Sequence, residues 1–399
     1  MLGWELPPHN SGGLGVACYQ LCKALSAHGA DIDFIVPYTA DHGIDFMRVR
    51  SATPQSVEVV QRAGIAYDSM KYILKDGSSK ELSLHEQVAL YRESMDHILQ
   101  TETYDIIHAH DWLTFQAALY AKQQTGLPLI AQVHATEFDR SGGGSGNQLV
   151  REIEEIGLLQ ADRIIAVSEL TRQTIVREYG IPADKISVVH NSIDIGDYEA
   201  ASTDNAYAYL QTLKQHGWRV VVNVGRLTVQ KGLPQLLQAM QAVVQQQPKT
   251  MLLVVGSGEQ KYELIEMAAS LGIGPNVLFA DFQRGKRWRD AYAIADLFVM
   301  PSVSEPFGLT ALEAICYNTP ILVSKQSGVA ELITHSLQVD FWDIRKMADA
   351  IAAVVANDAL RDELAANSTQ EVKRLSWKDS AIKLADIYNA HTQPIRMPT

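Results

Sequence analysis

Two basic side chains stand close together after an apolar run in the second half of the chain. The run ends at Val224, Gly225 and Arg226 follow it, and Lys231-Gly232 comes five residues after Arg226. If the run is a strand and the next segment a helix, a guanidinium and an ammonium group meet at one strand-to-helix turn. Both groups bind phosphate oxygens, the guanidinium as a fork and the ammonium as a point charge. The pattern indicates a pyrophosphate site, with two solvated loop charges as the alternative.

Two carboxylates frame a second candidate site further along the chain. Glu305 and Glu313 have seven residues between them, and Gly308, Leu309 and Thr310 lie in that interval. We expect Glu305 in a turn and Glu313 two turns inside the following helix, so that each meets a different part of a ligand. The N–H groups at the start of such a helix suit a phosphate. Because an unpartnered buried carboxylate is costly, Glu313 on an apolar helix face needs a ligand or a salt bridge.

A glycine-rich turn near the amino terminus offers another anion site. Gly12, Gly13, Leu14 and Gly15 follow the short segment 1–5 and open a predicted helix. Glycine lets the backbone approach a ligand closely and a helix N-terminus favours negative charge, so the turn suits a phosphate. It matches neither the P-loop nor the dinucleotide-binding glycine pattern. A tight turn with a purely structural role is the alternative.

Histidines gather at two predicted strand ends in the first half of the chain. His108, His110 and Asp111 end one strand, and His134 ends the next. Alternate histidines on a strand share a face, which suggests a metal site. No remote carboxylate or cysteine set completes a ligand shell, so we predict no metal. His134 also precedes the glycine-rich stretch 141–146, which is flexible enough to act as a lid.

The three cysteines, Cys18, Cys22 and Cys316, are too few for a disulfide framework and indicate a reducing compartment. Cys18 and Cys22 lie one helical turn apart and could form half of a metal site. Without a second cysteine or histidine pair nearby in the sequence, we interpret them as buried positions of a helix.

The composition excludes several classes of protein. Of 399 residues, 47% are hydrophobic and 20% charged, which is ordinary for a globular protein and excludes a disordered chain. The net charge of −12 argues against a nucleic-acid partner. There is no basic residue before Lys23, as a secretory signal would need, and no apolar run of the roughly 20 residues that span a bilayer. We therefore expect a cytoplasmic protein, and we interpret Lys71, Lys75 and Lys80 as a solvated face and not a membrane contact.

Short β-branched runs alternate with helical patterns, which predicts an α/β protein with parallel sheets covered by helices on both faces. Helices are expected at 15–28 and 84–101 and from about 372 to 390. The polar stretch 192–215 indicates a boundary between two doubly wound lobes at 1–195 and 206–375. Segment 1–5 is very short for a first strand, which leaves open a native start upstream of Met1. The expected strands are 32–37, 105–109, 129–134, 163–167, 185–190, 219–224, 251–256, 276–280, 297–301, 320–324 and 338–340.

Taken together, these motifs resemble glycosyltransferase family 4, the retaining group with the GT-B fold, over nearly the whole chain. The ordered set carries the resemblance, since any one motif would be weak. The segment from Ser376-Trp377 to Tyr388 is similar to the terminal helix, 376–391 here, that in this fold crosses back onto the first lobe. The matching segments are Trp4-Glu5-Leu6-Pro7-Pro8, Gly12-Gly13-Leu14-Gly15, His110-Asp111-Trp112, His134-Ala135-Thr136-Glu137, Val167-Ser168, His190-Asn191, Gly225-Arg226-Leu227, Lys231-Gly232 and the pair Glu305 and Glu313.

The resemblance implies a role for each matched residue. Arg226 and Lys231 would neutralise the diphosphate of a sugar-nucleotide donor, Glu305 would hold hydroxyls of the transferred sugar, Glu313 would bind the ribose, and His134 would lie near the reacting face. The other implied donor-site residues are Gly12, Gly13, Leu14 and Gly15 with Gly225, Gly308, Leu309 and Thr310 around the diphosphate, Asp111 and Asn191 lining the cleft between the lobes, and Phe282 and Gln283 at the base.

The implied activity is a retaining hexosyl transfer that needs neither a metal nor a cofactor. Glucose from ADP- or UDP-glucose would pass to an α-glucan or a small carbohydrate, as in glycogen and starch synthases. Attack on the same face as departure is favoured, because no matched motif supplies a nucleophile, and a covalent intermediate stays open. Asn10 replaces a lysine of the sister synthase family. The alternatives are a GT-B sugar-nucleotide epimerase, a transferase with a lipid or small-molecule acceptor, a sugar-nucleotide sensor and a nicotinamide dehydrogenase.

Overall fold

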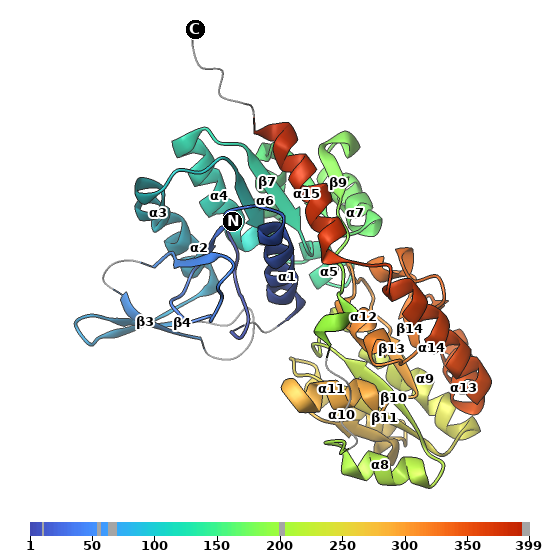
Figure 1. Ribbon diagram of the computed structural model, residues 1–399. Coiled ribbons are helices and arrows are strands. Elements are labelled where there is room, and N and C mark those ends of the chain that lie inside the picture. Colours follow the sequence, from blue (N-terminus) through green and yellow to red (C-terminus); the bar gives the residue numbers. More distant parts are fainter. Residues whose placement is uncertain (10–11, 54–56, 63–69, 199–203, 393–399) are drawn as a thin grey trace. The chain divides into compact units, whose positions relative to one another are not determined.

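The computed structural model describes residues 1–9, 12–53, 57–62, 70–198 and 204–392, which form two compact units (Figure 1). Unit 1 takes the described residues of Met1–Thr136, Asn147–Asn191 and Trp377–Thr399, and unit 2 takes those of Glu137–Gly146 and Ser192–Ser376. Asn10, which departs from the synthase pattern, lies outside the described residues, as does the tail beyond residue 392.

Unit 1 is built on a parallel sheet. Segment 1–5 does not form a full strand. It contributes only Leu2, which bridges to Ile35 on one side and Ala109 on the other and so joins β1 to β6. From edge to edge the order is β2, β1, the Leu2 bridge, β6, β7, β8 and β9. The strands are β1 (Asp33–Val36), β2 (Arg48–Ser51), β6 (Ile107–His110), β7 (Leu129–Val133), β8 (Arg163–Ala166) and β9 (Ile186–Val188).

Helices connect these strands, and the last helix of the chain returns to unit 1. Figure 1 shows α15, in red, alongside α1, in dark blue, and the two helices are in contact. Tyr388 of α15 bonds His108 of β6, with 2.5 Å between Oη and Nδ1. The predicted return of the terminal helix is therefore confirmed. The helices are α1 (Gly13–Ala27), α2 (Leu84–Glu93), α3 (Met95–Thr101), α4 (Trp112–Thr125), α6 (Gln148–Gln160), α7 (Glu169–Tyr179) and α15 (Trp377–His391).

Unit 2 has a six-stranded, all-parallel sheet in the order β12-β11-β10-β13-β14-β15. Counted along the chain, this is the Rossmann order 3-2-1-4-5-6. The order of the strands therefore reverses between β10 and β13, which are neighbours in the sheet. The strands are β10 (Arg219–Val224), β11 (Thr250–Val255), β12 (Val277–Phe279), β13 (Leu297–Met300), β14 (Ile321–Ser324) and β15 (Leu337–Val339).

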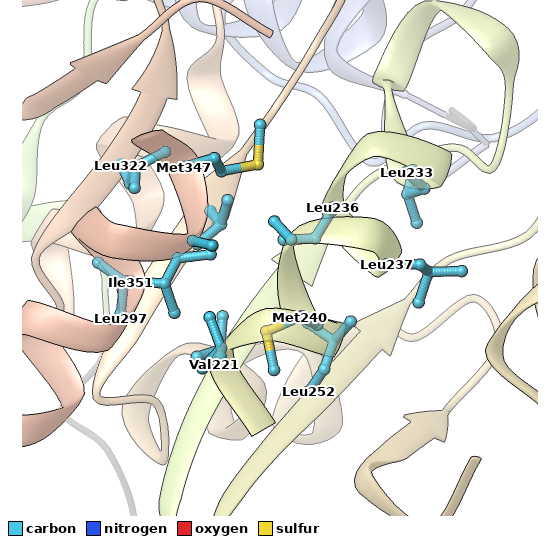
Figure 2. Packing of buried hydrophobic residues seen from close by; sticks show 14 of the residues in the cluster. Val221, Leu233, Leu236, Leu237, Met240, Leu252, Leu297, Leu322, Met347 and Ile351 are labelled. Carbon is cyan, nitrogen blue, oxygen red and sulfur yellow. The ribbon is translucent and has the colours of Figure 1, made fainter. Parts of the chain in front are cut away.

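The core of unit 2 lies between this sheet and two helices on one of its faces. In Figure 2, Leu236 of α9 faces Met347 and Ile351 of α13, and Met240 of α9 lies beside Val221 of β10. All five side chains are at most 1% exposed, because the apolar stripe of each helix faces the apolar strands. The helices are α5 (Glu137–Arg140), α8 (Ala208–Gln215), α9 (Leu233–Gln246), α10 (Lys261–Ser270), α11 (Gly285–Ala293), α12 (Leu309–Cys316), α13 (Ile344–Ala356) and α14 (Asp358–Val372).

Three parts of unit 1 differ from the sequence prediction. The edge strand β2 (Arg48–Ser51) was not among the expected strands. The expected helix 84–101 is divided at Ser94, which ends α2 and precedes α3. A three-stranded antiparallel sheet was not predicted, although its first two strands have the apolar sequences VEVVQR and MKYIL. Its second turn holds Gly77 at a φ of 82°, and the sequence Asp76-Gly77 is the signal that could have indicated it. The strands are β3 (Val57–Arg62), β4 (Met70–Leu74) and β5 (Ser79–Leu82).

The division into units differs from the predicted lobes in two segments. Residues 192–195 belong to unit 2, although the predicted first lobe extends to residue 195. Glu137–Gly146 lies inside the predicted first lobe but groups with unit 2. The reason is local: α5 contacts the short 3-10 helix η3 (Val229–Lys231), and Ser304 Oγ donates to Asp139 Oδ1 at 2.5 Å. Part of the expected boundary stretch is also ordered structure, since Asn205 donates to the carbonyl oxygen of Asp290 in α11.

None of the helices among the described residues combines the length and the apolar character that crossing a bilayer requires.

The Tyr388 hydroxyl should stabilise unit 1. His108 is 0% exposed, so Tyr388→Phe leaves a buried ring nitrogen without this partner. Such a loss costs about 1–3 kcal/mol of unfolding free energy. Urea denaturation should show this loss for Tyr388→Phe and almost none for Tyr262→Phe, whose side chain is 77% exposed. Equal stability of the two variants would contradict the assignment.

Candidate functional site

The site in unit 2 lies at the point where the strand order reverses, at the carboxyl ends of β10 and β13. We call this point the β10–β13 crossover. In a doubly wound sheet the loops after the two strands at this point leave toward opposite faces, and ligands bind at the carboxyl ends between them. Here the two strands are β10 and β13. The loop after β10 carries Gly225, Arg226 and Lys231, and the loop after β13 carries Glu305. The fold therefore brings the predicted cations and the first predicted carboxylate to the same edge.

Lys231 and Glu305 form a direct ion pair. Lys231 Nζ lies 2.5 Å from Glu305 Oε2, and their side chains are 19% and 10% exposed. Ser302 Oγ donates to the same oxygen at 3.0 Å. The backbone of Glu305 is fixed as well, since its N–H donates to Gln326 and its carbonyl accepts from Gly328. A part-buried carboxylate held this firmly keeps the lysine ammonium at the crossover.

Two glycines are needed where loops approach the sheet. Gly232 has a φ of 65°, and a Cβ there would lie 2.1 Å from the carbonyl oxygen of Pro301. Gly232 therefore lets the loop bearing Lys231 press against the end of β13. Gly308 has a φ of 108° and a Cβ there would lie 2.6 Å from Met300, so glycine is required at the start of α12 too.

The remaining predicted diphosphate ligands of unit 2 lie on these loops. Arg226 is part-buried and follows Gly225, whose N–H donates to the carbonyl oxygen of Val255. Leu309 and Thr310 are the first two residues of α12, and Gly308 is its N-cap. Positive partial charge at this helix start suits an anion. Arg226 and the start of α12 thus both lie at the carboxyl edge of the sheet. That they bind a diphosphate remains a prediction.

Glu313 sits among aromatic side chains. It is 9% exposed on α12, and Tyr292 Oη donates to its Oε2 at 2.7 Å. Trp288 and Tyr317 pack around Tyr292 with ring centroids 5.4 and 5.9 Å away. Burial in this cluster raises the pKa of Glu313 to about 7, and the Tyr292 bond only partly opposes the shift. The sequence predicted that Glu313 needs a ligand or a salt bridge. In the structure its partner is the hydroxyl of Tyr292.

Phe282 and Gln283 lie on the loop between β12 and α11. Phe282 is 49% exposed, and the guanidinium of Arg284 lies over its ring, 5.2 Å from the centroid. Gln283 donates through Nε2 to the carbonyl oxygen of Ala280. An exposed aromatic face with an adjacent cation can stack on a nucleobase, which keeps the predicted base-binding role chemically reasonable.

In unit 1 a single aspartate ties two strand ends together. Asp111 follows β6 with a φ of 62°, a conformation that residues other than glycine rarely adopt. Its Oδ1 accepts from the N–H of His134 at 2.6 Å and from that of Ala135 at 3.4 Å. Asp111 thus fixes the backbone where His134 leaves β7, so its observed role is to position His134.

A row of aromatic rings leads from His134 into the core of unit 1. His134 Nε2 and His110 Nδ1 are 3.1 Å apart, and the rings of His110 and His108 stack with centroids 4.3 Å apart. Tyr388 bonds the far side of His108. Burial lowers the pKa of all three histidines, that of His134 to about 3. The rings are therefore neutral at ordinary pH.

The glycine turn at the start of α1 has an acidic neighbour that the sequence did not reveal. Gly12 is the N-cap, Gly13 and Leu14 are the first helical residues, and the Gly15 N–H lies 3.4 Å from Glu5 Oε1. Glu5 is 2% exposed. A carboxylate at this helix start competes with a phosphate for the same N–H groups, so this predicted phosphate site gains no support.

Asn191, which was also predicted to line the donor site, is 6% exposed and is the last residue before the chain enters unit 2.

Sequence analysis did not identify Ser302 and Tyr292, the two residues that bond the carboxylates of Glu305 and Glu313. Ser302 lies two residues past the last residue of β13, at the edge where ligands bind, and this position could have marked it. Tyr292 lies on another helix, 21 residues before Glu313, and no sequence pattern connects the two.

Comparison with known proteins identifies the family. Residues 11–197 match the family described as Glycosyltransferase Family 4, and residues 211–371 match Glycosyl transferases group 1. A D-inositol 3-phosphate glycosyltransferase of Rhodococcus opacus is 30% identical over 304 residues, which cover 72% of this chain and 68% of that protein. The chain belongs to glycosyltransferase family 4. A glycogen synthase of Mycobacterium tuberculosis is 26% identical to this family 4 chain, over 100% of it and 96% of the synthase.

Solved structures confirm the fold of this family 4 chain. A sucrose-phosphate synthase from Thermosynechococcus elongatus superposes with a TM-score of 0.77 at 20% identity, covering 98% of this chain and 97% of that one. The HepE protein of Anabaena in complex with UDP-glucose gives a TM-score of 0.71 at 19% identity, covering 98% and 99%. The predicted α/β class with GT-B architecture and the glycogen-synthase-like resemblance are confirmed.

Glu313 should make stability depend on pH. Its pKa is about 7 in the folded protein against 4.5 ordinarily, so between these values the folded state holds the proton more tightly. The contribution of Glu313 to the free energy of unfolding therefore falls as pH rises through 7, by up to about 3 kcal/mol. Glu313→Gln cannot ionise, so it should gain stability relative to wild type between pH 5 and pH 8 in denaturant titrations.

The matched control is Glu266→Gln, on the exposed face of α10, which should show no such gain. A difference between Glu313→Gln and wild type that does not change with pH would contradict the assignment.

Proposed function

We propose that this family 4 protein is a metal-independent, retaining hexosyltransferase whose sugar-nucleotide donor binds at the β10–β13 crossover of unit 2. The observation that supports this most is the Lys231–Glu305 ion pair, with Arg226 on the same loop as the lysine. A cation and a carboxylate held side by side can bind the two halves of one donor. The ammonium takes a phosphate oxygen, and the carboxylate takes hydroxyls of the sugar.

The ion pair leaves capacity for both contacts. An ammonium has three N–H groups, and the bond to Glu305 Oε2 uses one of them. Glu305 Oε2 already accepts from Lys231 and Ser302, so Oε1 is the oxygen that would meet a sugar hydroxyl. Arg226 adds a second cation, and the start of α12 adds partial positive charge. Together they offset the charge that builds on the departing diphosphate, usually the largest electrostatic contribution to such a reaction.

The proposed chemistry is loss of a nucleoside diphosphate from the anomeric carbon and attack by the acceptor hydroxyl on the same face. The leaving phosphate would take the proton of that hydroxyl. His134 is neutral at ordinary pH because burial lowers its pKa to about 3. It is therefore proposed to bind a hydroxyl through a neutral ring and not to act as a charged general acid.

For the donor and acceptor we propose glucose from ADP- or UDP-glucose, passed to an α-glucan or a small carbohydrate. The likeness to a glycogen synthase over the whole chain supports an α-glucan. The HepE structure with UDP-glucose supports a uridine donor. The relative that acts on D-inositol 3-phosphate supports a small phosphorylated acceptor as the second candidate.

Turnover with a panel of donors and acceptors tests the proposed activity. Nucleoside diphosphate should be released from ADP- or UDP-glucose only when glycogen, a maltooligosaccharide or inositol phosphate is present. The product should keep the anomeric configuration of the donor and form equally well in EDTA. Conversion of the UDP-sugar without an acceptor would instead show an epimerase, and no turnover with any common donor would contradict the proposal.

Arg226→Ala and Lys231→Ala should each lower kcat/KM by about 10²–10³-fold, because each removes a cation from the leaving diphosphate. The control is Lys249→Ala, which removes an exposed lysine beside the amino end of β11, at the opposite edge of the sheet. It should leave kcat/KM unchanged. A loss below threefold in either active-site variant would show that the diphosphate binds elsewhere.

A further inference from the structure

Three potential metal ligands from different elements of unit 1 meet beside His134. Cys18 lies on α1, His110 ends β6 and His134 follows β7. One ligand atom from each residue lies within 4.8 Å of the other two. Cys18 and His110 are 1% and 0% exposed, whereas His134 is part-exposed. The sequence suggested each half of this cluster separately and offered no partner for either.

The cluster has the composition and spacing of a zinc site. A thiolate and two imidazoles are ligands that Zn²⁺ prefers. His110 Nδ1 and His134 Nε2 are 3.1 Å apart. Two nitrogens bound to one tetrahedral zinc at roughly 2.05 Å are separated by about 3.3 Å. The facing nitrogens are therefore already close to the separation of two ligands of one ion, and the rings need to turn so that both lone pairs point at it.

We propose that Cys18, His110 and His134 form a Zn²⁺ site with three protein ligands and one position left for water or a substrate oxygen. Binding replaces the thiol proton of Cys18, which passes to solvent, and leaves a zinc-bound thiolate. The proton shared between the two facing ring nitrogens moves to the other nitrogen of its own ring.

The surroundings favour a cation at this point. Two carboxylates lie close by: Glu5 Oε1 is 3.4 Å from the Gly15 nitrogen of α1, and Asp111 directly follows His110 in the chain. A divalent ion is attracted by the same two carboxylates. His110 Nε2 is buried, and no group in the described part of the chain pairs with it. His110 thus has only its bond to His134 and its stacking contacts, and no competing hydrogen bond holds the ring away from an ion.

Zinc at this site would inhibit glycosyl transfer, because zinc on His134 Nε2 fixes the ring proton on Nδ1, which then cannot accept a hydrogen bond from a sugar hydroxyl. This consequence rests on the proposed function. The binding itself does not, since it depends only on the three ligands.

Titration of the full-length, metal-free protein with Co²⁺ tests the binding directly. Thiolate ligation gives a sulfur-to-cobalt charge-transfer band in the near ultraviolet, and Zn²⁺ should displace the ion and remove the band. Cys18→Ala should lose the band. Cys22→Ala should keep it, because Cys22 lies one turn further along the same helix and faces Met1, with 3.4 Å between their sulfur atoms. Circular dichroism verifies that both variants fold.

A wild-type protein that takes up Co²⁺ without a sulfur band, or takes up none, would overturn the proposal even if Cys18→Ala failed to fold. A band retained in Cys18→Ala would overturn it as well. In a separate assay with the active transferase, Zn²⁺ should inhibit wild type and Cys22→Ala by at least tenfold, reversibly with EDTA, and Cys18→Ala much less. Cobalt binding without inhibition would leave the site in place and count against the role of His134.

Discussion

The pairing of Lys231 with Glu305 is the interaction on which the rest of the account depends. The two residues are 74 positions apart in the chain and meet because β10 and β13 are neighbours in the sheet. Any shift in strand order would separate them. Gly232 permits the close approach, since a side chain there would collide with Pro301. The fold thus fixes a cation and a carboxylate at the point where doubly wound sheets bind ligands.

Unit 1 applies the same principle to a different chemistry. Asp111 holds the backbone of His134 at the end of β7, and buried rings back the imidazole as far as Tyr388 of the terminal helix. Burial keeps these histidines neutral, so their rings offer hydrogen bonds but no positive charge. The two cations that we propose for the donor, Arg226 and Lys231, both belong to unit 2.

The sequence could predict those features that local pattern determines. Apolar runs predicted every strand of the unit 2 sheet. The sequence also placed Arg226 and Lys231 on one loop, because Lys231 follows Arg226 by only five positions. Pairings set by the tertiary fold could not be predicted: Lys231 with Glu305, Glu313 with Tyr292, and Cys18 with two histidines. The carboxylate of Glu5 beside the glycine turn belongs to the same group. Spacing says which loop holds a residue, but strand order decides what it faces.

The most direct measurement is a crystal structure of the protein with a bound nucleoside diphosphate. The account predicts that the diphosphate lies at the carboxyl ends of β10 and β13. Lys231 Nζ and the Arg226 guanidinium should lie within hydrogen-bonding distance of its oxygens, with Glu305 still bonded to Lys231. A diphosphate bound in another place, or a Lys231 that contacts only Glu305, would contradict the central claim.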